Sequence, residues 1–341
     1  MRPKVITQAH GSGGRAMRDL IANLIVERFD NPVLRTLEDQ ARLRLDELAA
    51  RGDRLAMTTD SYVVSPLFFP GSDIGALAVN GTVNDLAVSG ATPLYLTCGL
   101  ILEEGLELSV LERVLDSMAA AAKSAGVSIV TGDTKVVEHG SGDQIFINTA
   151  GIGVIPHGRD PAVRRVQAGD RVIVNGMLGD HGAAILLARG ELSLEADIGS
   201  DCQPLNGLVE VIFGACSDVH AMRDVTRGGL ATVLNEMADG GGVQIEIDEK
   251  ALPVRDVVRG TCELLGLDPL YLANEGKLAV VVPGDAADAV VAAMRKHPAG
   301  REACVVAEVV SGRAGRVIMK TGFGGNRVVD TLVGDQLPRI C

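Results

Sequence analysis

The sequence has no tryptophan, and aromatic residues make up only 3% of its 341 residues. Hydrophobic residues nevertheless amount to 47% of the chain, so its core must be built from valine, leucine, isoleucine and alanine. Such a core is typical of tightly packed α/β layers. A chain of this length can bury a sizeable core, and it fits two domains better than one.

Other absences exclude broad classes of protein. No run of about 18 apolar residues is present, so we expect no membrane span. Residues 1–11 lack the apolar stretch of a signal peptide, which favours a cytoplasmic location. The net charge is -12 and no lysine and arginine cluster stands out, so nucleic acid is not an expected partner. An acidic protein can still bind a nucleotide, because Mg²⁺ bridges carboxylates to phosphates.

The cysteines include no C-x-x-C pair, so a zinc or iron–sulfur site is not expected. Cys341 stands apart because it is the last residue of the sequence, although composition alone favours a chance cysteine there. The other five stand beside apolar or small residues and are predicted to be buried and unreactive: Cys98, Cys202, Cys216, Cys262 and Cys304.

Hydrophobic periodicity divides the chain into two units and predicts an α+β fold. In residues 1–155 we expect helices at 15–28, 74–89 and 110–125, and strands at 55–59, 94–102, 127–131 and 144–155. In residues 156–320 we expect helices near 181–189, 205–215 and 228–239, and strands near 171–175, 243–247, 277–282, 304–310 and 315–320. The boundary is placed at the break 157–161, and residues 321–341 are expected to form a mobile tail over the surface.

Four aspartates are candidate metal ligands. Asp60 ends a predicted strand, Asp73 precedes a predicted helix, and Asp85 lies inside that otherwise apolar helix, where an unpaired carboxylate is costly. Asp224 precedes a glycine pair at 228–229. Separated carboxylates suit Mg²⁺ ions that bridge a triphosphate, because Mg²⁺ takes few protein oxygens. The alternatives are a helix N-cap for Asp73 and a buried hydrogen bond for Asp85.

Several glycine-rich turns could cradle phosphate. Residues 10–14 (HGSGG) lead straight into a predicted helix, whose first N–H groups can bind an anion, although a flexible turn explains them equally well. The pair at 228–229 lets the backbone approach a ligand. The segments 131–135 (TGDTK), 179–182 (GDHG) and 274–277 (NEGK) are weaker, since each also fits an ordinary capped turn. No G-x-x-x-x-G-K-[ST] is present, so this is not a P-loop ATPase.

Together these segments resemble the ATP-binding superfamily that includes aminoimidazole ribonucleotide synthetase, selenophosphate synthetase and thiamine monophosphate kinase. The marks are the strand aspartate Asp60, the pair Asn84-Asp85 in a helix, and the turn 224–230 (DVTRGGL). Within that superfamily the chain is most similar to the HypE family of hydrogenase maturation. That similarity runs through essentially the whole chain, in 10–14, 131–135, 179–182, 274–277 and the ending Pro338-Arg339-Ile340-Cys341.

The resemblance implies an ATP-dependent carbamoyl dehydratase, which turns an S-carbamoyl group on Cys341 into a thiocyanate for the cyanide ligands of nickel–iron hydrogenase. It implies a homodimer whose N-terminal sheets build the ATP sites. It also implies that HypF supplies the carbamoyl group and that a HypC–HypD complex receives the cyano group. The implied cofactors are ATP and Mg²⁺, with Asp60, Asp73, Asp85 and Asp224 as metal ligands. The implied nucleotide contacts are Gly11, Ser12, Gly13, Gly14, Asn84, Thr131, Gly132, Asp133, Thr134, Thr226 and Arg227.

The chemistry of that reaction suggests roles for individual side chains. A thiolate accepts an acyl-type group well, and about ten residues of extended tail span roughly 30 Å, so Cys341 could visit several sites. Water is a poor leaving group, so ATP should phosphorylate the carbamoyl oxygen. Glu275 is the predicted base, and Lys135 is predicted to polarise the oxygen or steady the phosphate. The alternatives for proton transfer are His10, His139 and His181.

Two other interpretations stay open at this point. A sibling kinase or synthetase would use ATP on a free substrate and would not need Cys341, whereas a non-catalytic carrier would bind ATP without turning it over. For the thiol itself, we expect the terminal carboxylate to raise the pKa of Cys341 and Arg339 to oppose that rise.

Overall fold

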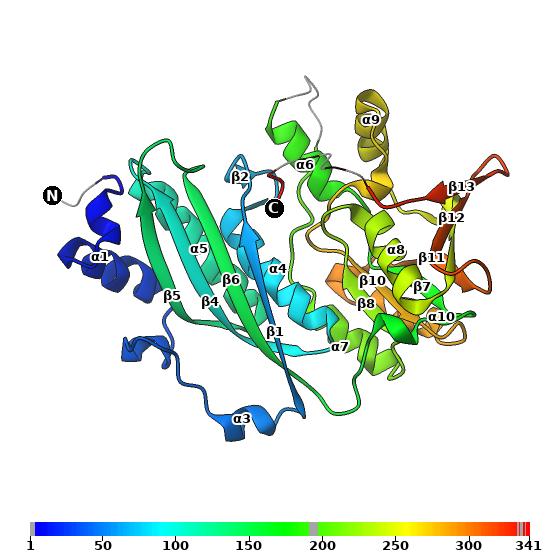
Figure 1. Cartoon of the computed structure of the whole chain (residues 1–341), viewed down its shortest axis with the longest axis horizontal. Coiled ribbons are helices and arrows are strands. Elements are labelled where there is room, and N and C mark those ends of the chain that lie inside the picture. Colours follow the sequence, from blue (N-terminus) through cyan, green and yellow to red (C-terminus); the bar gives the residue numbers. More distant parts are fainter. Residues whose placement is uncertain (1–3, 191–196, 333, 335–336, 338) are drawn as a thin grey trace.

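The computed structural model describes residues 4–190, 197–332, 334, 337 and 339–341. Two sheets dominate the described chain, each with its own helices (Figure 1). The first has the strand order β1-β6-β4-β5 and the second the order β13-β12-β9-β11-β7-β10-β8. The α+β fold expected from the sequence is therefore confirmed.

The first sheet is built from the long strands β1 (Arg54–Tyr62), β4 (Thr92–Glu103), β5 (Ser128–Val137) and β6 (Ile145–Ile155). β6 pairs antiparallel with both β1 and β4, whereas β5 pairs parallel with β4. The parallel pair needs a crossover, which α5 (Leu108–Ala125) supplies. α4 (Ile74–Val88) packs beside α5 against the sheet.

α4 is apolar around nearly its whole circumference, and all but two of its residues are buried. Its neighbours explain this, because α4 also contacts α7 (Asn206–Ala215) and β8 (Ala221–Asp224) of the second half of the chain. A helix that is hydrophobic all round belongs in a core. Asp85, which is half-buried on this helix, therefore lies where the two halves meet.

The second sheet contains β8 and six further strands: β7 (Arg171–Val174), β9 (Gln244–Asp248), β10 (Leu278–Val282), β11 (Cys304–Val310), β12 (Arg316–Lys320) and β13 (Asn326–Val329). β10 is buried along its whole length. Its side chains alternate between two cores, because successive residues of a strand point to opposite faces. Ala279 and Val281 join one core, and Leu278, Val280 and Val282 join the other.

Helices cover both faces of this sheet. α8 (Gly229–Gly241) contributes Leu230, Leu234 and Met237 to one core. The other core contains residues of α7 and α10 (Ala287–Met294). α6 (Asp180–Ala188) and α9 (Asp256–Leu265) contact each other.

The remaining elements are short. They are α1 (Arg15–Leu20), the π-turn η2 (Ile21–Ile25), α2 (Val26–Arg28), α3 (Leu45–Ala49), β2 (Phe68–Phe69), β3 (Ser72–Asp73) and the 3-10 turns η1 (Gln8–Gly11), η3 (Leu34–Thr36), η4 (Val163–Arg165), η5 (Glu249–Ala251), η6 (Pro269–Tyr271) and η7 (Pro298–Gly300). The helix expected at 15–28 is thus present with a π-turn in its middle.

Some boundaries differ from the sequence prediction. β1 continues to Tyr62, so Asp60 lies inside the strand, because β6 offers hydrogen-bond partners along that whole length. β5 likewise continues to Val137 along β4, so the segment 131–135 is strand and not a turn. α9 and β13 were not predicted, and β13 makes part of the expected tail a strand of the second sheet. β6 ends at Ile155 and β7 begins at Arg171, and we keep residue 156 as the proposed domain boundary.

The first sheet leaves one face exposed. Tyr62 at the end of β1 is buried on the α4 side, so the odd-numbered residues of β1 point to the other side. On that exposed face, Leu55 of β1 is 58% exposed and Met57 of β1 is 74% exposed. Ile101 of β4 lies on the same face and is 42% exposed. Leu55 and Met57 lie toward one end of this face and Ile101 toward the other, because they are opposite residues 152–154 and residue 146 of β6. Exposed apolar residues along one sheet face make that face a candidate interaction surface.

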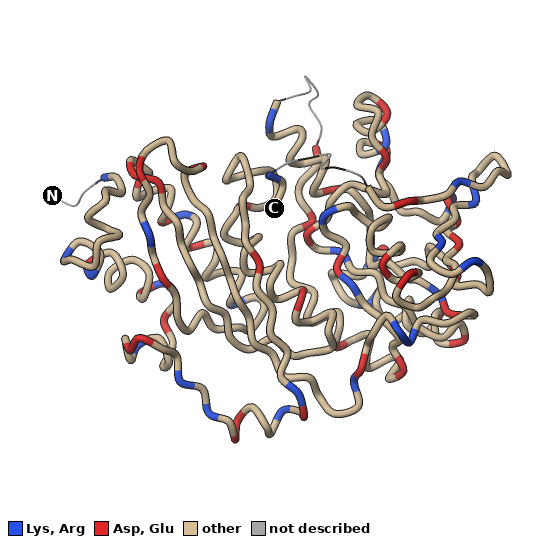
Figure 2. Tube along the Cα trace, viewed as in Figure 1, with Lys and Arg blue, Asp and Glu red and all other residues tan. Residues whose placement is uncertain are grey.

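Within the described residues, no helix combines the length and apolar character that crossing a bilayer requires. Figure 2 shows lysine and arginine spread over the trace, without a basic face. The cytoplasmic location expected from the sequence stays a prediction.

Candidate active site

The end of the chain is docked against α6 and the first half of the molecule (Figure 1). Ile340 is buried, and Leu337 and Cys341 pack against the same apolar cluster. The structure thus differs from the expectation of a tail lying over the surface. The reason is that the apolar side chain of Ile340 packs into the hydrophobic core of the first half of the chain. Pro338 lies outside the described residues.

The thiol of Cys341 lies beside the carboxylate of Glu275, so that each group shifts the pKa of the other. Glu275 is buried, and its Oε1 has no protein partner among the described residues. Burial raises the pKa of Glu275 well above its usual range, and the charges of Asp201, Asp224 and Asp60 raise it further. The predicted base and the predicted acceptor thiol therefore lie side by side.

The docked Cys341 is held in its protonated form. Burial raises the pKa of the thiol far above its usual value, and the charge of Glu275 adds to the rise. The cation that opposes this pKa shift is Arg227, and not Arg339 as expected. Arg339 pairs instead with Asp143, at 2.9 Å between Nη1 and Oδ2.

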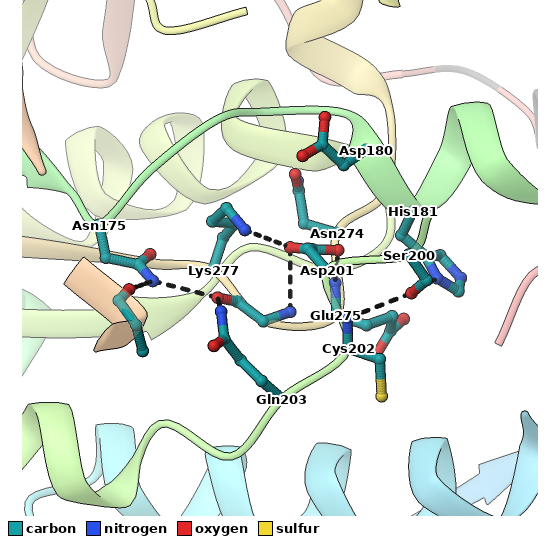
Figure 3. Close-up of polar contacts among 12 residues, drawn as sticks. Asn175, Asp180, His181, Ser200, Asp201, Cys202, Gln203, Asn274, Glu275 and Lys277 are labelled. Carbon is teal, nitrogen blue, oxygen red and sulfur yellow. Dashed lines mark hydrogen bonds and ion pairs between the residues drawn. The ribbon is translucent and has the colours of Figure 1, made fainter. Parts of the chain in front are cut away.

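Glu275 stands on a tight turn that Asp201 holds in place (Figure 3). The Asp201 carboxylate accepts hydrogen bonds from the backbone N–H of Glu275 at 3.0 Å and of Gly276 at 3.1 Å. Its Oδ2 also accepts from Lys277 Nζ at 2.8 Å, and both side chains of this ion pair are almost fully buried. Removing one partner of a buried pair leaves an uncompensated charge, so the pair fixes the turn strongly.

Glycine is required at position 276 because the backbones approach closely. A Cβ there would lie 1.9 Å from the carbonyl oxygen of Asp201. The Gly276 carbonyl accepts hydrogen bonds from Asn175 Nδ2 at 3.1 Å and from Gln203 Nε2 at 3.2 Å. The segment 274–277 is therefore a rigid mount for Glu275.

Three of the four predicted metal ligands come together. Thr58 Oγ1 donates to Asp85 Oδ2 at 2.8 Å. The carboxyl groups of Asp85 and of Asp224, at the end of β8, lie close enough to shift each other's pKa. Burial, and then the charges of Asp85 and Asp60, raise the pKa of Asp224 to about 7. Burial also raises the pKa of Asp85, with a further rise from Asp60. Carboxylates crowded in this way favour a bound cation.

Asp73 takes the structural role that the sequence left open. Its Oδ1 caps α4 by accepting from the N–H of Gly75 at 2.7 Å and of Ala76 at 3.1 Å. Across the described ranges, no three His, Cys, Asp or Glu side chains are grouped closely enough to hold a metal ion by themselves. A cation at Asp60, Asp85 and Asp224 would therefore need further oxygens from a ligand or water.

Asn84 is hydrogen-bonded inside the protein, and its predicted contact with a nucleotide stays a prediction. Its Oδ1 accepts from the N–H of Leu205 at 2.8 Å. Its Nδ2 donates to the carbonyl oxygens of Gln203 at 3.1 Å and Glu275 at 3.3 Å. The buried amide thus ties α4 to the segment that carries the base.

A cavity of about 540 Å³ separates the N-terminal helical segments from β5. It brings predicted nucleotide residues from two segments together: Gly13, Thr131, Gly132, Asp133 and Thr134. Gly11 lies against β5, where a Cβ would come within 2.7 Å of the Val136 nitrogen, whereas Ser12 and Gly14 are exposed. Neither Glu275 nor Cys341 lines this cavity.

Lys135 does not join Glu275 within one copy of the chain. It is exposed on β5 and in register with Ile101, so it lies on the exposed face of the sheet. Of the three candidate histidines, His10 caps its own turn by accepting from Thr7 N–H at 3.0 Å. His139 is largely exposed near Glu103. His181 alone of these three lies at the docked tail, with Nε2 at 2.9 Å from the Ile340 oxygen.

The turn after β8 places its two predicted nucleotide residues differently. Arg227 is exposed, and its positive charge opposes the rise in the pKa of the Cys341 thiol. Thr226 is half-buried. Among the other cysteines, Cys98, Cys216 and Cys262 are buried as expected, but Cys202 and Cys304 are only half-buried. Burial raises the pKa of each, to about 12 for Cys98 and Cys202 and to about 11 for Cys262.

Comparison with known proteins agrees with this arrangement. The AIR synthase related protein models match in both halves, the N-terminal domain over residues 37–155 and the C-terminal domain over 167–320. Carbamoyl dehydratase HypE of Rhodobacter capsulatus is 57% identical over 341 residues, which is 100% of this chain and 99% of the relative. The chain belongs to the HypE family of AIR synthase related proteins. The resemblance seen in the sequence is confirmed.

Solved structures of HypE proteins share the fold. The crystal structure of hydrogenase maturation protein HypE in complex with ATP has a TM-score of 0.93 at 50% identity, covering 98% of this chain and 99% of that one. HypE in the HypE–HypF complex has a TM-score of 0.79 at 46% identity, covering 92% and 99%. The sequence suggested roles for Glu275 and Cys341, which lie side by side in the structure, but none for Asp201 and Lys277. A lysine directly before the fully apolar strand β10 was the available sign of the buried pair.

Proposed function

We propose that the protein is an ATP-dependent carbamoyl dehydratase that converts an S-carbamoyl group on its own Cys341 into a thiocyanate. The product supplies the cyanide ligands of a nickel–iron hydrogenase. The observation that carries this proposal is the docking of the Cys341 thiol beside the buried carboxylate of Glu275, in a chain that matches a carbamoyl dehydratase HypE along its full length.

The reaction balances as loss of one oxygen and two protons from the carbamoyl group. The carbamoyl oxygen takes the γ-phosphoryl group of ATP and ADP leaves, after which the C–O bond breaks and phosphate departs. The nitrogen gives up two protons as the C≡N bond forms. Glu275 suits this step because a catalytic base works best when its pKa lies near the working pH, and burial raises that of Glu275. Its unpartnered Oε1 can accept an N–H.

Mg²⁺ fits the crowded carboxylates of Asp60, Asp85 and Asp224, because hard oxygen donors suit this ion. When bound, Mg²⁺ would neutralise triphosphate charge. Asp73 would contribute only through its second oxygen, since Oδ1 caps α4. The chain's own part is to hold these carboxylates beside the turn that carries Glu275.

We infer that the nucleotide uses the cavity between the N-terminal segments and β5, with Gly13 and residues 131–134 in its wall. Gly11, Ser12, Gly14, Thr226 and Arg227 stay candidates around it. One ATP-bound HypE, 50% identical to this chain, supports nucleotide binding. The cavity does not reach Glu275, so completing the site needs either a shift within the chain or a second copy.

A homodimer supplies such a second copy. The exposed face of the first sheet presents Leu55, Met57 and Ile101, and Lys135 lies on the same face. Packing two such sheets together would bury the apolar residues and bring Lys135 to the interface. There its charge could act on a phosphate or the carbamoyl oxygen.

Two further partners follow from the proposed reaction. HypF would load the carbamoyl group, a proposal supported by the solved HypE–HypF complex, whose HypE is 46% identical to this chain. A HypC–HypD complex would accept the cyano group, as the family resemblance implies. Both steps need Cys341 outside its docked position, because burial and the charge of Glu275 keep the docked thiol protonated.

The test is mass spectrometry of the C-terminal peptide after incubation with HypF, a carbamoyl donor and ATP. The wild-type chain should form first a carbamoyl and then a cyano adduct on Cys341. Glu275→Gln and Lys135→Ala should accumulate the carbamoyl adduct, because the acceptor thiol is untouched, and Cys341→Ala should form neither. ATP turnover that survives Cys341→Ala, with no adduct in the wild type, would favour a sibling kinase or synthetase. An adduct without ATP turnover would favour a carrier.

A further inference from the structure

The two ends of α6 hold the last residues of the chain. His181, the second residue of α6, places Nε2 at 2.9 Å from the carbonyl oxygen of Ile340. Arg189, directly after α6, donates from Nη2 to the carbonyl oxygen of Arg339 at 2.7 Å. The same guanidinium donates to the Ser65 oxygen at 3.0 Å through Nε. Both carbonyls immediately before Cys341 are thus fixed from one short helix.

The protonation of His181 follows from its partners. A carbonyl oxygen can only accept, so the proton must be on Nε2. Nδ1 lies 2.8 Å from the Ser200 hydroxyl, which can donate to it when the ring is neutral. Burial lowers the pKa of His181 and so favours the neutral ring. The ring is fully enclosed, with Phe69 in an edge-to-face contact at 5.5 Å.

The same contacts connect the tail to the base. Ser200, which bonds His181, directly precedes Asp201, whose carboxylate holds the turn of Glu275 (Figure 3). The Ser200 hydroxyl also accepts from the N–H of Cys202 at 3.2 Å. One short segment therefore bonds both the group that holds Cys341 and the group that holds Glu275.

We propose that His181 and Arg189 are positioning residues that form a latch, which holds Cys341 against Glu275 for dehydration and must open for carbamoyl loading. The dehydration half of this inference rests on the proposed function. The two steps make opposite demands, because a buried protonated thiol is a poor nucleophile and an exposed thiolate is a good one. Weakening the latch therefore speeds reactions of the thiol with outside reagents and slows dehydration.

The first experiment measures the latch without the reaction. Alkylation of Cys341 by iodoacetamide is followed by peptide mass spectrometry, which separates it from the other cysteines, on the full chain without ATP. His181→Ala should speed alkylation about 3- to 10-fold, the effect of one lost hydrogen bond. His181→Gln should stay near wild type, because its amide can still donate to the Ile340 carbonyl. His157→Ala is the matched control, since His157 is exposed and pairs with Asp53.

The second experiment starts from carbamoylated protein and adds ATP. His181→Ala should form the thiocyanate more slowly by a similar factor, while HypF loads it at least as fast as wild type. If His181→Ala does not fold, Arg189→Leu should shift both rates in the same directions. An unchanged alkylation rate in a folded variant, or His181→Gln behaving like His181→Ala, overturns the latch. Faster alkylation with no thiocyanate from the wild type keeps the latch and rejects the proposed function.

Discussion

Asp224, the last residue of β8, lies beside Asp85 of α4 and shifts the pKa of that carboxyl, although the two come from opposite halves of the chain. In the second sheet Asp224 is also paired with Leu278, the first residue of β10. The turn that carries Glu275 leads directly into β10. Asp224, which lies beside Asp85, and the proposed base Glu275 are therefore both positioned by the start of β10. A displacement of this strand end would move both this carboxylate and the base.

Asp85→Asn should remove most ATP turnover while the fold survives. The change is nearly isosteric, but it removes one of the crowded charges proposed to hold Mg²⁺, and we expect at least about a tenfold loss. Turnover is measured as phosphate release across a Mg²⁺ titration, with folding checked by circular dichroism. Asp39→Asn, at an exposed position, is the control and should be unaffected. Full turnover of folded Asp85→Asn at ordinary Mg²⁺ would sink the metal assignment.

Glu275→Gln should stabilise the protein increasingly as the pH rises. The pKa of Glu275 in the folded state is raised above its ordinary value of 4.5. At a pH between the ordinary pKa and the folded-state pKa, Glu275 is therefore protonated in the folded protein and ionised in the unfolded one. The contribution of protonated Glu275 to the free energy of unfolding is therefore fully present below about pH 4.5. It is lost as the pH rises toward the folded-state pKa, by up to about 1.4 kcal/mol per pH unit.

Glutamine has no such titration, so denaturant unfolding of the two proteins should agree best near pH 5 and diverge by pH 8. A difference that is independent of pH across this range would show that Glu275 titrates normally. The comparison isolates Glu275 because Asp85 and Asp224 remain in both proteins.

Met57→Glu should break the proposed dimer. Met57 is 74% exposed on the outer face of β1, and a charge there could not be buried against a second sheet without a partner. Light scattering should report a dimer for the wild type and a monomer for the variant. Leu264→Glu, at an exposed leucine of α9, should remain dimeric. A wild-type chain that is strictly monomeric while turning over ATP would reject the shared site.

Gly276→Ala should destabilise the protein by about 2–4 kcal/mol and abolish dehydration. The added Cβ would lie 1.9 Å from the Asp201 carbonyl oxygen, a backbone atom that cannot turn aside. Gly260→Ala is the control, because its Cβ would meet nothing within 4 Å on the helix α9. That change should be neutral or stabilising by about 0.5–1 kcal/mol, since alanine favours helices. Equal melting temperatures for the two variants would contradict the close contact.

The elements with strong periodicity could be predicted from the sequence. β10 is a continuous apolar run and α4 is mostly apolar, and the sequence predicted the bounds of both within a residue or two. The aspartates Asp60, Asp85 and Asp224 were also recognisable, because a charge among apolar neighbours is costly without a purpose. Their approach to one another could not be derived, since it depends on how β8 packs against α4.

Side-chain partners were the harder part. Asn84 stands beside Asp85 in the sequence, yet its amide faces Gln203 and Leu205. Lys135 belongs to a strand whose alternation turns it to the face opposite Asp60, which the interpretation of 131–135 as a turn concealed. Asp201 lies in a stretch without periodicity, and only a long-range contact gives it a role.

The docked tail also bears on how the protein survives between turnovers. Oxidation of a cysteine to sulfenic acid proceeds through the thiolate and needs access from solvent. In its resting place Cys341 is half-buried, and burial together with the charge of Glu275 keeps the thiol protonated. We therefore expect the docked Cys341 thiol to react slowly with peroxide. Oxidation of Cys341 should then occur mainly while the tail is undocked for reaction with a partner protein.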